Sequence, residues 1–157
     1  MTGVWITNSS TSLEAMLNPL TAAIEDGFAA SQISILENSD VVAVTDQFID
    51  TVDRVFRAYG HATPDIERTP LEQEVAFERI RTHHRDAIQH AKEQGHEVAV
   101  DITPGRKFMS AIAFATGMRY GADHVFYFYL ESGDYYGKWF PEIPRTAVNL
   151  YDFAEVV

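Results

Sequence analysis

The chain has 157 residues, 46% hydrophobic and 12% aromatic, which is enough for one hydrophobic core and gives no reason to expect a second domain. The absence of cysteine excludes disulfides, thiol nucleophiles and cysteine-ligated zinc, and no apolar run is long enough for a membrane span or a secretory signal. The formal net charge of −11 disfavours duplex nucleic acid as a partner. We therefore expect residues 1–157 to form one cytoplasmic domain without membrane contact.

Apolar runs and helical patterns alternate along the chain. Their predicted order is strand 4–7, a helix beginning after residue 10, strand 33–36, helix 41–59, a weak strand at 65–68, helix 69–95, strand 97–103, helix 108–120, strand 124–130 and strand 147–153. The start of the first helix has two solutions: the capping box of Thr11 and Glu14, or Asn18 with Pro19 at the first helical position. Thr69, with Pro70 and Glu72 after it, predicts the start of the third helix.

This alternation predicts an α/β fold, a Rossmann-like three-layer sandwich with a mainly parallel sheet. The run from 124 to 130 is almost uninterrupted in its apolar and aromatic residues, as is typical of a strand covered on both faces. The segment from 132 to 145 has no helical pattern. We therefore expect the last strand to pair antiparallel at the edge of the sheet.

Ligands of open parallel sheets bind beyond the carboxyl ends of the strands, where this chain has two unusual turns. The first, residues 8–12, reads NSSTS and offers hydroxyls and backbone N–H groups to an anion, although a simple helix cap is an equal alternative. The second reads DITPGRKFMS over residues 101–110. Gly105 permits a tight turn, and Arg106 and Lys107 then lie at a helix N-terminus, where cations are unfavourable unless an anion offsets them. This favours an anionic ligand.

The second turn resembles the signature of CRISPR-associated Rossmann-fold (CARF) domains, an Asp-x-Thr-Gly-Gly-Thr-Lys-x-Met type of turn after the fourth strand. The matching residues are Asp101, Thr103, Gly105, Lys107 and Met109. Pro104 and Arg106 replace a glycine and a small residue of that pattern. The loop at residues 8–12 corresponds to the other ligand loop of the family.

The resemblance implies a function as well as a fold. CARF domains bind cyclic oligoadenylates across the two-fold axis of a homodimer, and a domain without an attached effector resembles the ring nucleases, which cleave the messenger without metal or cofactor. Ser9 or Ser10 and Lys107 would be the catalytic residues. The ligand-binding residues would be Asn8, Thr11, Thr103, Pro104, Gly105, Arg106 and Met109.

Two other classes of function remain open on sequence grounds. The chain could hold the messenger without cutting it, as a sensor or sponge, or it could be a flavodoxin-like protein whose hydroxyl-rich first loop cradles a flavin phosphate. The six histidines show no metal-ligand spacing, so we expect no metal site. A final group of aromatic residues could stack on adenine, pack a dimer partner or cover the sheet edge: Tyr135, Tyr136, Trp139 and Phe140.

Overall fold

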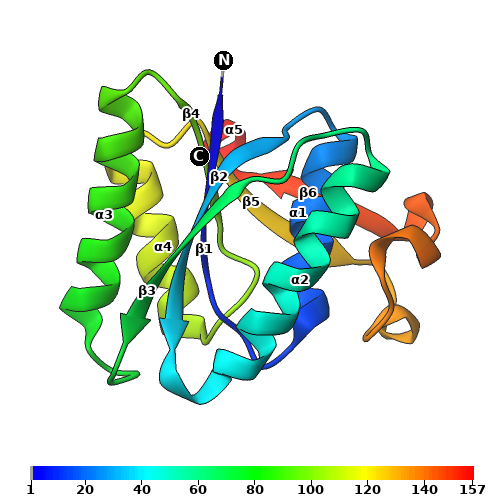
Figure 1. Ribbon diagram of the computed structural model, residues 1–157, viewed down its shortest axis with the longest axis horizontal. Helices are drawn as coiled ribbons and strands as arrows, with labels where there is room; N and C mark the ends of the chain where they lie inside the picture. Colours follow the sequence, from blue (N-terminus) through cyan, green and yellow to red (C-terminus); the bar gives the residue numbers. More distant parts are fainter. Residues whose placement is uncertain (1) are drawn as a thin grey trace.

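The computed structural model describes residues 2–157 as a six-stranded sheet with helices on both faces (Figure 1). The strands are β1 (Gly3–Asn8), β2 (Ala30–Asn38), β3 (Asp65–Leu71), β4 (Glu97–Asp101), β5 (His124–Leu130) and β6 (Val148–Asp152). The helices are α1 (Leu13–Glu25), α2 (Val42–Ala58), α3 (Phe77–Glu93), α4 (Lys107–Arg119) and the short α5 (Phe153–Val156). None of these helices is long and apolar enough to cross a bilayer.

The strand order is β3-β2-β1-β4-β5-β6, and every neighbouring pair is parallel except β5 and β6. Figure 1 shows α1 and α2 on one side of the sheet and α3 and α4 on the other. The predicted Rossmann-like sandwich with an antiparallel edge strand is confirmed. Because β1 and β4 are adjacent central strands, the turns that follow them emerge side by side.

The two faces of β1 build two cores. Trp5 is fully buried against α1 and α2, whereas Val4 and Ile6, which alternate with it, pack against α3 and α4. Full burial of a large apolar side chain contributes roughly 1.5–3 kcal/mol, so both faces anchor β1 firmly. The strand that leads into the first polar loop is therefore a rigid support.

The expectation that β5 is covered on both faces is wrong. Phe126 and Phe128 are buried on the side of α1, but Tyr127 is 37% exposed and Tyr129 42% exposed on the opposite side. The reason is that this side is covered only by the short α5, whose Phe153 stacks on Tyr127 with 6.1 Å between the ring centroids. Tyr129 instead contacts Tyr151 of β6, with 6.1 Å between the ring centroids.

Both predicted starts of the first helix are wrong. Ser12 is the N-cap of α1, since its Oγ accepts a hydrogen bond from the backbone of Ala15, and Pro19 lies inside the helix. Asn18 caps nothing. Its side chain donates to the carbonyl of Lys138 at 2.9 Å and accepts from the backbone of Phe140 at 2.9 Å, and so holds the β5–β6 connection in place.

The predicted helix start at Thr69 is also wrong. Residues 69–71 continue β3, where Thr69 pairs with Leu36 and Leu71 with Asn38, and α3 begins only at Phe77. Pairing with β2 overrides the local capping pattern, and a proline such as Pro70 is tolerated because β3 is an edge strand. Residues 72–76 therefore form a loop at the carboxyl edge of the sheet.

The β5–β6 connection contains three single-turn 3-10 helices, Gly133–Tyr135, Phe140–Glu142 and Arg145–Ala147. Phe140 is buried and packs edge-on against Phe128, with 6.2 Å between the centroids. This connection is the orange segment beyond α1 in Figure 1. Among its aromatic residues, Phe140 covers the sheet edge, while Tyr136 is 78% exposed.

Candidate functional site

The two predicted ligand turns touch at Gly105. This residue has a φ of +98°, and a Cβ added to it would lie 3.3 Å from the Cβ of Asn8 and 3.3 Å from the sulfur of Met109. A side chain here would be strained by the backbone angle and crowded by both neighbours. Gly105 therefore lets the turn after β4 close against the loop after β1.

Between the two turns is a small pocket of about 230 Å³. The first loop lines it with Ser9, Ser10 and Thr11, and the second with Gly105, Arg106 and Met109, so the structure brings together most of the predicted site residues. It does not place Asn8, Thr103, Pro104 or Lys107 in this lining. The remaining wall is supplied by Asn38, Asp40, Val41 and Glu74.

The serines of the first loop differ in what they already bind. Ser9 is 4% exposed and its Oγ accepts from the backbone of Asn38 at 2.9 Å, which fixes the loop to the end of β2. Ser10 is partly exposed and its Oγ accepts from the backbone of Ser12 at 3.1 Å. Thr11 is exposed. Ser10 is thus the better placed of the two serines for contact with a ligand, and Ser9 supports the loop.

Asp101 underlies the second turn. It is fully buried, with Oδ1 accepting from the backbone of Thr103 at 2.9 Å and Oδ2 accepting from the hydroxyl of Thr7 at 3.3 Å. Burial raises the pKa of this carboxyl to about 7, against the opposing effect of these hydrogen bonds. The hydroxyl of Thr103 accepts from the backbone of Phe128 at 3.0 Å and so ties the turn to β5.

The N-terminus of α4 follows directly and has no side-chain cap. Its first backbone N–H groups remain available to an anion, and the helix dipole favours negative charge there. Ser110 donates from its hydroxyl to the carbonyl of Ile102 at 2.7 Å and anchors this first turn to the end of β4. Lys107, the first residue of α4, is exposed and has no ion-pair partner within residues 2–157.

Arg106 has a partner that the sequence did not reveal. Its guanidinium forms an ion pair with the carboxylate of Glu74, from the loop between β3 and α3. The side chain of Arg106 is 67% exposed, so this ion pair faces solvent and contributes little to stability. Glu74 therefore offsets one of the two cations that the sequence had left without an anion.

Glu74 was missed because β3 was predicted to end at Arg68. A strand that continues to Leu71 places the next loop at the same edge as the two ligand turns. Because β2 is nine residues long, its neighbour β3 has to be extended over a similar length. A longer β3 would have placed Glu74 in the loop that follows it.

A second, aromatic pocket of about 280 Å³ lies beside α1 and the end of β5. Tyr135 and Tyr136 line it together with Thr103, Glu14 and Tyr129. Thr103 belongs to the second ligand turn, so this pocket reaches the start of that turn. The arrangement suits a flat aromatic group held beside an anion.

Comparison by sequence gives no match, neither to a family model nor to a curated protein. Solved structures do match by fold. A DNA nuclease of type III CRISPR defence, activated by cyclic oligoadenylate, is 16% identical, with a TM-score of 0.57 over 83% of this chain and 19% of its own. Enterococcus italicus Csm6, bound to cyclic hexa-2'-fluoro-hexa-dAMP, is 11% identical, with a TM-score of 0.61 over 84% of this chain and 34% of its own. Can2 from Sulfobacillus thermosulfidooxidans, in complex with cyclic tetra-adenylate, is 14% identical, with a TM-score of 0.50 over 80% of this chain and 31% of its own.

The chain shares its fold with one part of each of these proteins, over 80–84% of its own length. This agrees with the resemblance that the turn after β4 indicates. The chain spans between 19% and 34% of the length of these three proteins, so it corresponds to one part of each.

Proposed function

We propose that this CARF-fold chain binds a cyclic oligoadenylate across a homodimer and cleaves it to linear products. The observation that carries the proposal is the contact of the two carboxyl-edge turns at Gly105, which forms a pocket of hydroxyls and cation beside an uncapped helix N-terminus. Messenger removal in the cytosol would switch off type III CRISPR signalling. We propose the same ligand class that the solved neighbours carry.

The phosphates would be held by this chain's own donors. The first N–H groups of α4 and the hydroxyl of Ser10 face the turn region, and Arg106 would exchange its solvent-facing bond to Glu74 for a phosphate oxygen. Lys107 adds a second cation at the same helix end. Adenine rings would stack on two aromatic residues of the neighbouring pocket, the half-buried Tyr135 and the exposed Tyr136.

A homodimer is supported by the outer surface of α4. This helix is apolar on more than one side, and an apolar groove of about 270 Å³ is lined by Ile112 and Ala115 of α4 and by Phe77 of α3, which is 51% exposed. Glu78 and Arg81 flank the groove. Across a two-fold axis, Glu78 of each chain would pair with Arg81 of the other. Since α4 begins at Lys107, such an interface would place the two ligand turns side by side.

The proposed reaction needs no metal. The 2'-oxygen of an adenosine attacks the adjacent phosphorus, the 5'-oxygen of the next nucleotide leaves, and the product is a linear oligoadenylate with a 2',3'-cyclic phosphate and a free 5'-hydroxyl. The proton lost by the 2'-hydroxyl is gained by the leaving 5'-oxygen. Lys107, Arg106 and Ser10 would stabilise the charge that develops on the phosphoryl oxygens and hold the in-line geometry.

Single-turnover incubation tests the proposal. Excess protein is mixed with cyclic tetra-adenylate or cyclic hexa-adenylate, and the recovered nucleotide is separated by chromatography, while light scattering records the oligomeric state. We expect linear product and a dimer. Bound but unchanged ring would make the chain a sensor or sponge, and a ring that is neither bound nor cleaved would overturn the proposal.

A further inference from the structure

A polar groove of about 450 Å³ lies on the opposite side of α3 from α4, over β2 and β3. It shares no residue with the pocket between the ligand turns. On this face α3 packs on β2 and β3 at their carboxyl ends, where Ile80 contacts Leu36 and Leu71, and the groove lies along the rest of the two strands. The strands present Gln32, Ser34, Glu67 and Thr69 here.

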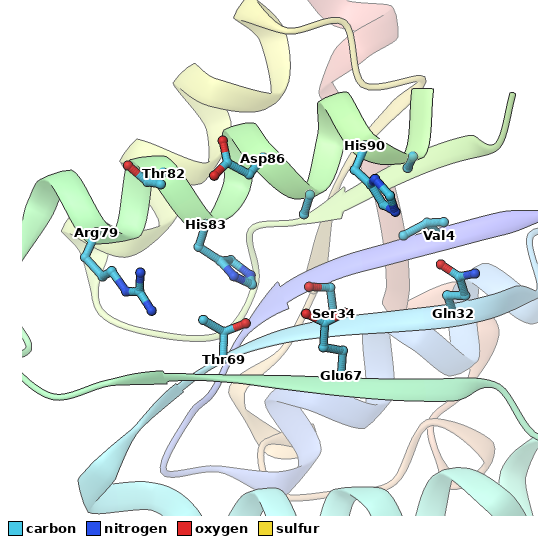
Figure 2. A pocket seen from close by; sticks show the side chains of 12 residues that line it. Val4, Gln32, Ser34, Glu67, Thr69, Arg79, Thr82, His83, Asp86 and His90 are labelled. Carbon is cyan, nitrogen blue, oxygen red and sulfur yellow. The ribbon is translucent and has the colours of Figure 1, made fainter. Parts of the chain in front are cut away.

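The buried imidazole of His83 is the central feature of the groove. Figure 2 shows this ring pointing from α3 toward the strands, above Ser34 and Thr69. His83 is 8% exposed, and its Nε2 atom is buried without a hydrogen-bond partner within residues 2–157. Burial, with a contribution from Arg79, lowers the pKa of His83 to about 4, so the ring is neutral. A buried polar atom without a partner is rare and calls for an explanation such as a missing ligand.

Two opposite charges in the groove also lack partners. Arg79 of α3 and Glu67 of β3 both line it, and neither forms an ion pair with any residue from 2 to 157. In Figure 2, Arg79 reaches toward the strands at one end of the groove, and Glu67 extends toward α3 beside Ser34, its neighbour in the β2–β3 register. A third charged residue, Asp86 of α3, also lines the groove but is paired with Arg85. The two unpaired charges make the groove dipolar, with hydroxyl groups between them.

We propose that this groove is a second binding site, for a small molecule that carries an anionic group at one end and hydrogen-bond donors at the other. The anionic group pairs with Arg79, the donors bind Glu67, and the middle of the ligand gives His83 its missing partner. The volume fits a molecule of nucleotide or dipeptide size. The proposal does not depend on the function of the carboxyl-edge turns.

The test uses nuclear magnetic resonance of the histidine rings, with adenosine monophosphate and the dipeptide alanyl-alanine as probes. We expect at least one probe to shift the ring signals of His83 and His90 with a dissociation constant of roughly 1 mM or below. The ring of His61, which lies beyond α2, is the internal reference and should not move. The titration is repeated in an Arg106→Ala variant, so that nucleotide bound at the turns is not mistaken for nucleotide bound in the groove.

Two matched variants assign the contact. Arg79→Gln should weaken binding by about tenfold or more, the scale of a charge-assisted hydrogen bond. Arg57→Gln removes the same charge from α2, on the other face of the sheet, where Arg57 forms only an exposed ion pair with Asp53, and it should leave the affinity within about twofold. Equal effects of the two variants, or no shift of His83 with either probe at 10 mM (roughly ten times the expected dissociation constant), would overturn the proposal.

Discussion

The amino and carboxyl edges of the sheet, where the parallel strands begin and end, differ in how completely their polar groups are paired. At the amino edge, His124 lies between Asp152 at 2.8 Å and Glu97 at 2.5 Å, and its ring stacks on Phe126 with 5.0 Å between centroids. Every polar atom of that ring has a partner. At the carboxyl edge, Asp101 is buried without a cation, and α4 begins with two cations and no cap.

The same contrast holds beneath the first ligand loop. Asn8 is fully buried and its Oδ1 lies 3.0 Å from Nε2 of His84, but its amide nitrogen has no partner in the described chain, nor does Nδ1 of His84. Unpaired polar groups and misplaced charges lower stability, and those of Asn8 and His84 lie directly beneath the proposed ligand loop. Nε1 of Trp5, in the core between α1 and α2, also has no partner in the described chain. In the proposed function, the amino edge maintains the fold, whereas the unpaired groups of the carboxyl edge gain their partners from the ligand.

The largest expected effect comes from Asp101. Its pKa is raised from 3.8 to about 7 in the folded protein, so stability that is fully present below pH 4 is lost as the pH rises through about 7. Asp101→Asn keeps an oxygen for the backbone of Thr103 and cannot ionise. Urea denaturation should show the variant gaining on the wild type by roughly 1.4 kcal/mol per pH unit between pH 5 and 7. A difference that does not change with pH would contradict the account.

The matched experiment at the amino edge is His124→Gln. Burial opposes the charge on His124, but hydrogen bonds to Asp152 and Glu97 outweigh it and raise the pKa above 6.5. This contribution to stability is fully present below pH 6.5 and is lost as the pH rises through the folded-state pKa. The variant should be less stable than the wild type at pH 6, with a smaller difference at pH 9 in the same denaturation series. A difference that grows toward pH 9 would contradict this reading.

Lys107→Ala should reduce single-turnover cleavage of cyclic tetra-adenylate by roughly a hundredfold, about 2.7 kcal/mol, while binding falls less. The reason is that a donor to the developing charge stabilises the transition state more than the bound ring. Lys92→Ala is the control, since it removes the same charge near the amino edge and breaks only an exposed ion pair with Asp123. Equal proportional losses of binding and cleavage in Lys107→Ala would make this lysine an anchor.

Glu74→Gln should have a smaller effect and in the opposite direction. Releasing Arg106 from its ion pair removes a competitor of the ligand phosphate, so the affinity for cyclic oligoadenylate should rise by a few fold, on the order of 1 kcal/mol or less. Titration calorimetry measures this. Glu72→Gln, in the same loop, is the control. A weaker affinity in Glu74→Gln would show that this carboxylate contacts the ligand itself.

The sequence predicted the parts of this molecule that depend on local pattern. β5 begins and ends where its apolar run does, and α4 follows Gly105 as the turn predicts. The prediction from sequence failed where a residue distant in the chain determines the local structure. Thr69 and Pro70 have the pattern of a helix start, but pairing with β2 makes them part of the sheet. Asn18 was one of two candidate helix starts because its real partners are about 120 residues away. The ion pair between Arg106 and Glu74 was not predicted either, because its two residues are far apart in the sequence.

The central claim is that the two carboxyl-edge turns together hold a cyclic oligoadenylate. Its most direct test is a calorimetric titration of cyclic tetra-adenylate and cyclic hexa-adenylate into the wild type and Arg106→Ala. We predict that the wild type binds one ring per two chains and that the variant binds it more weakly by on the order of 1–3 kcal/mol. Failure of both rings to bind the wild type, or unchanged affinity in Arg106→Ala, would contradict the claim.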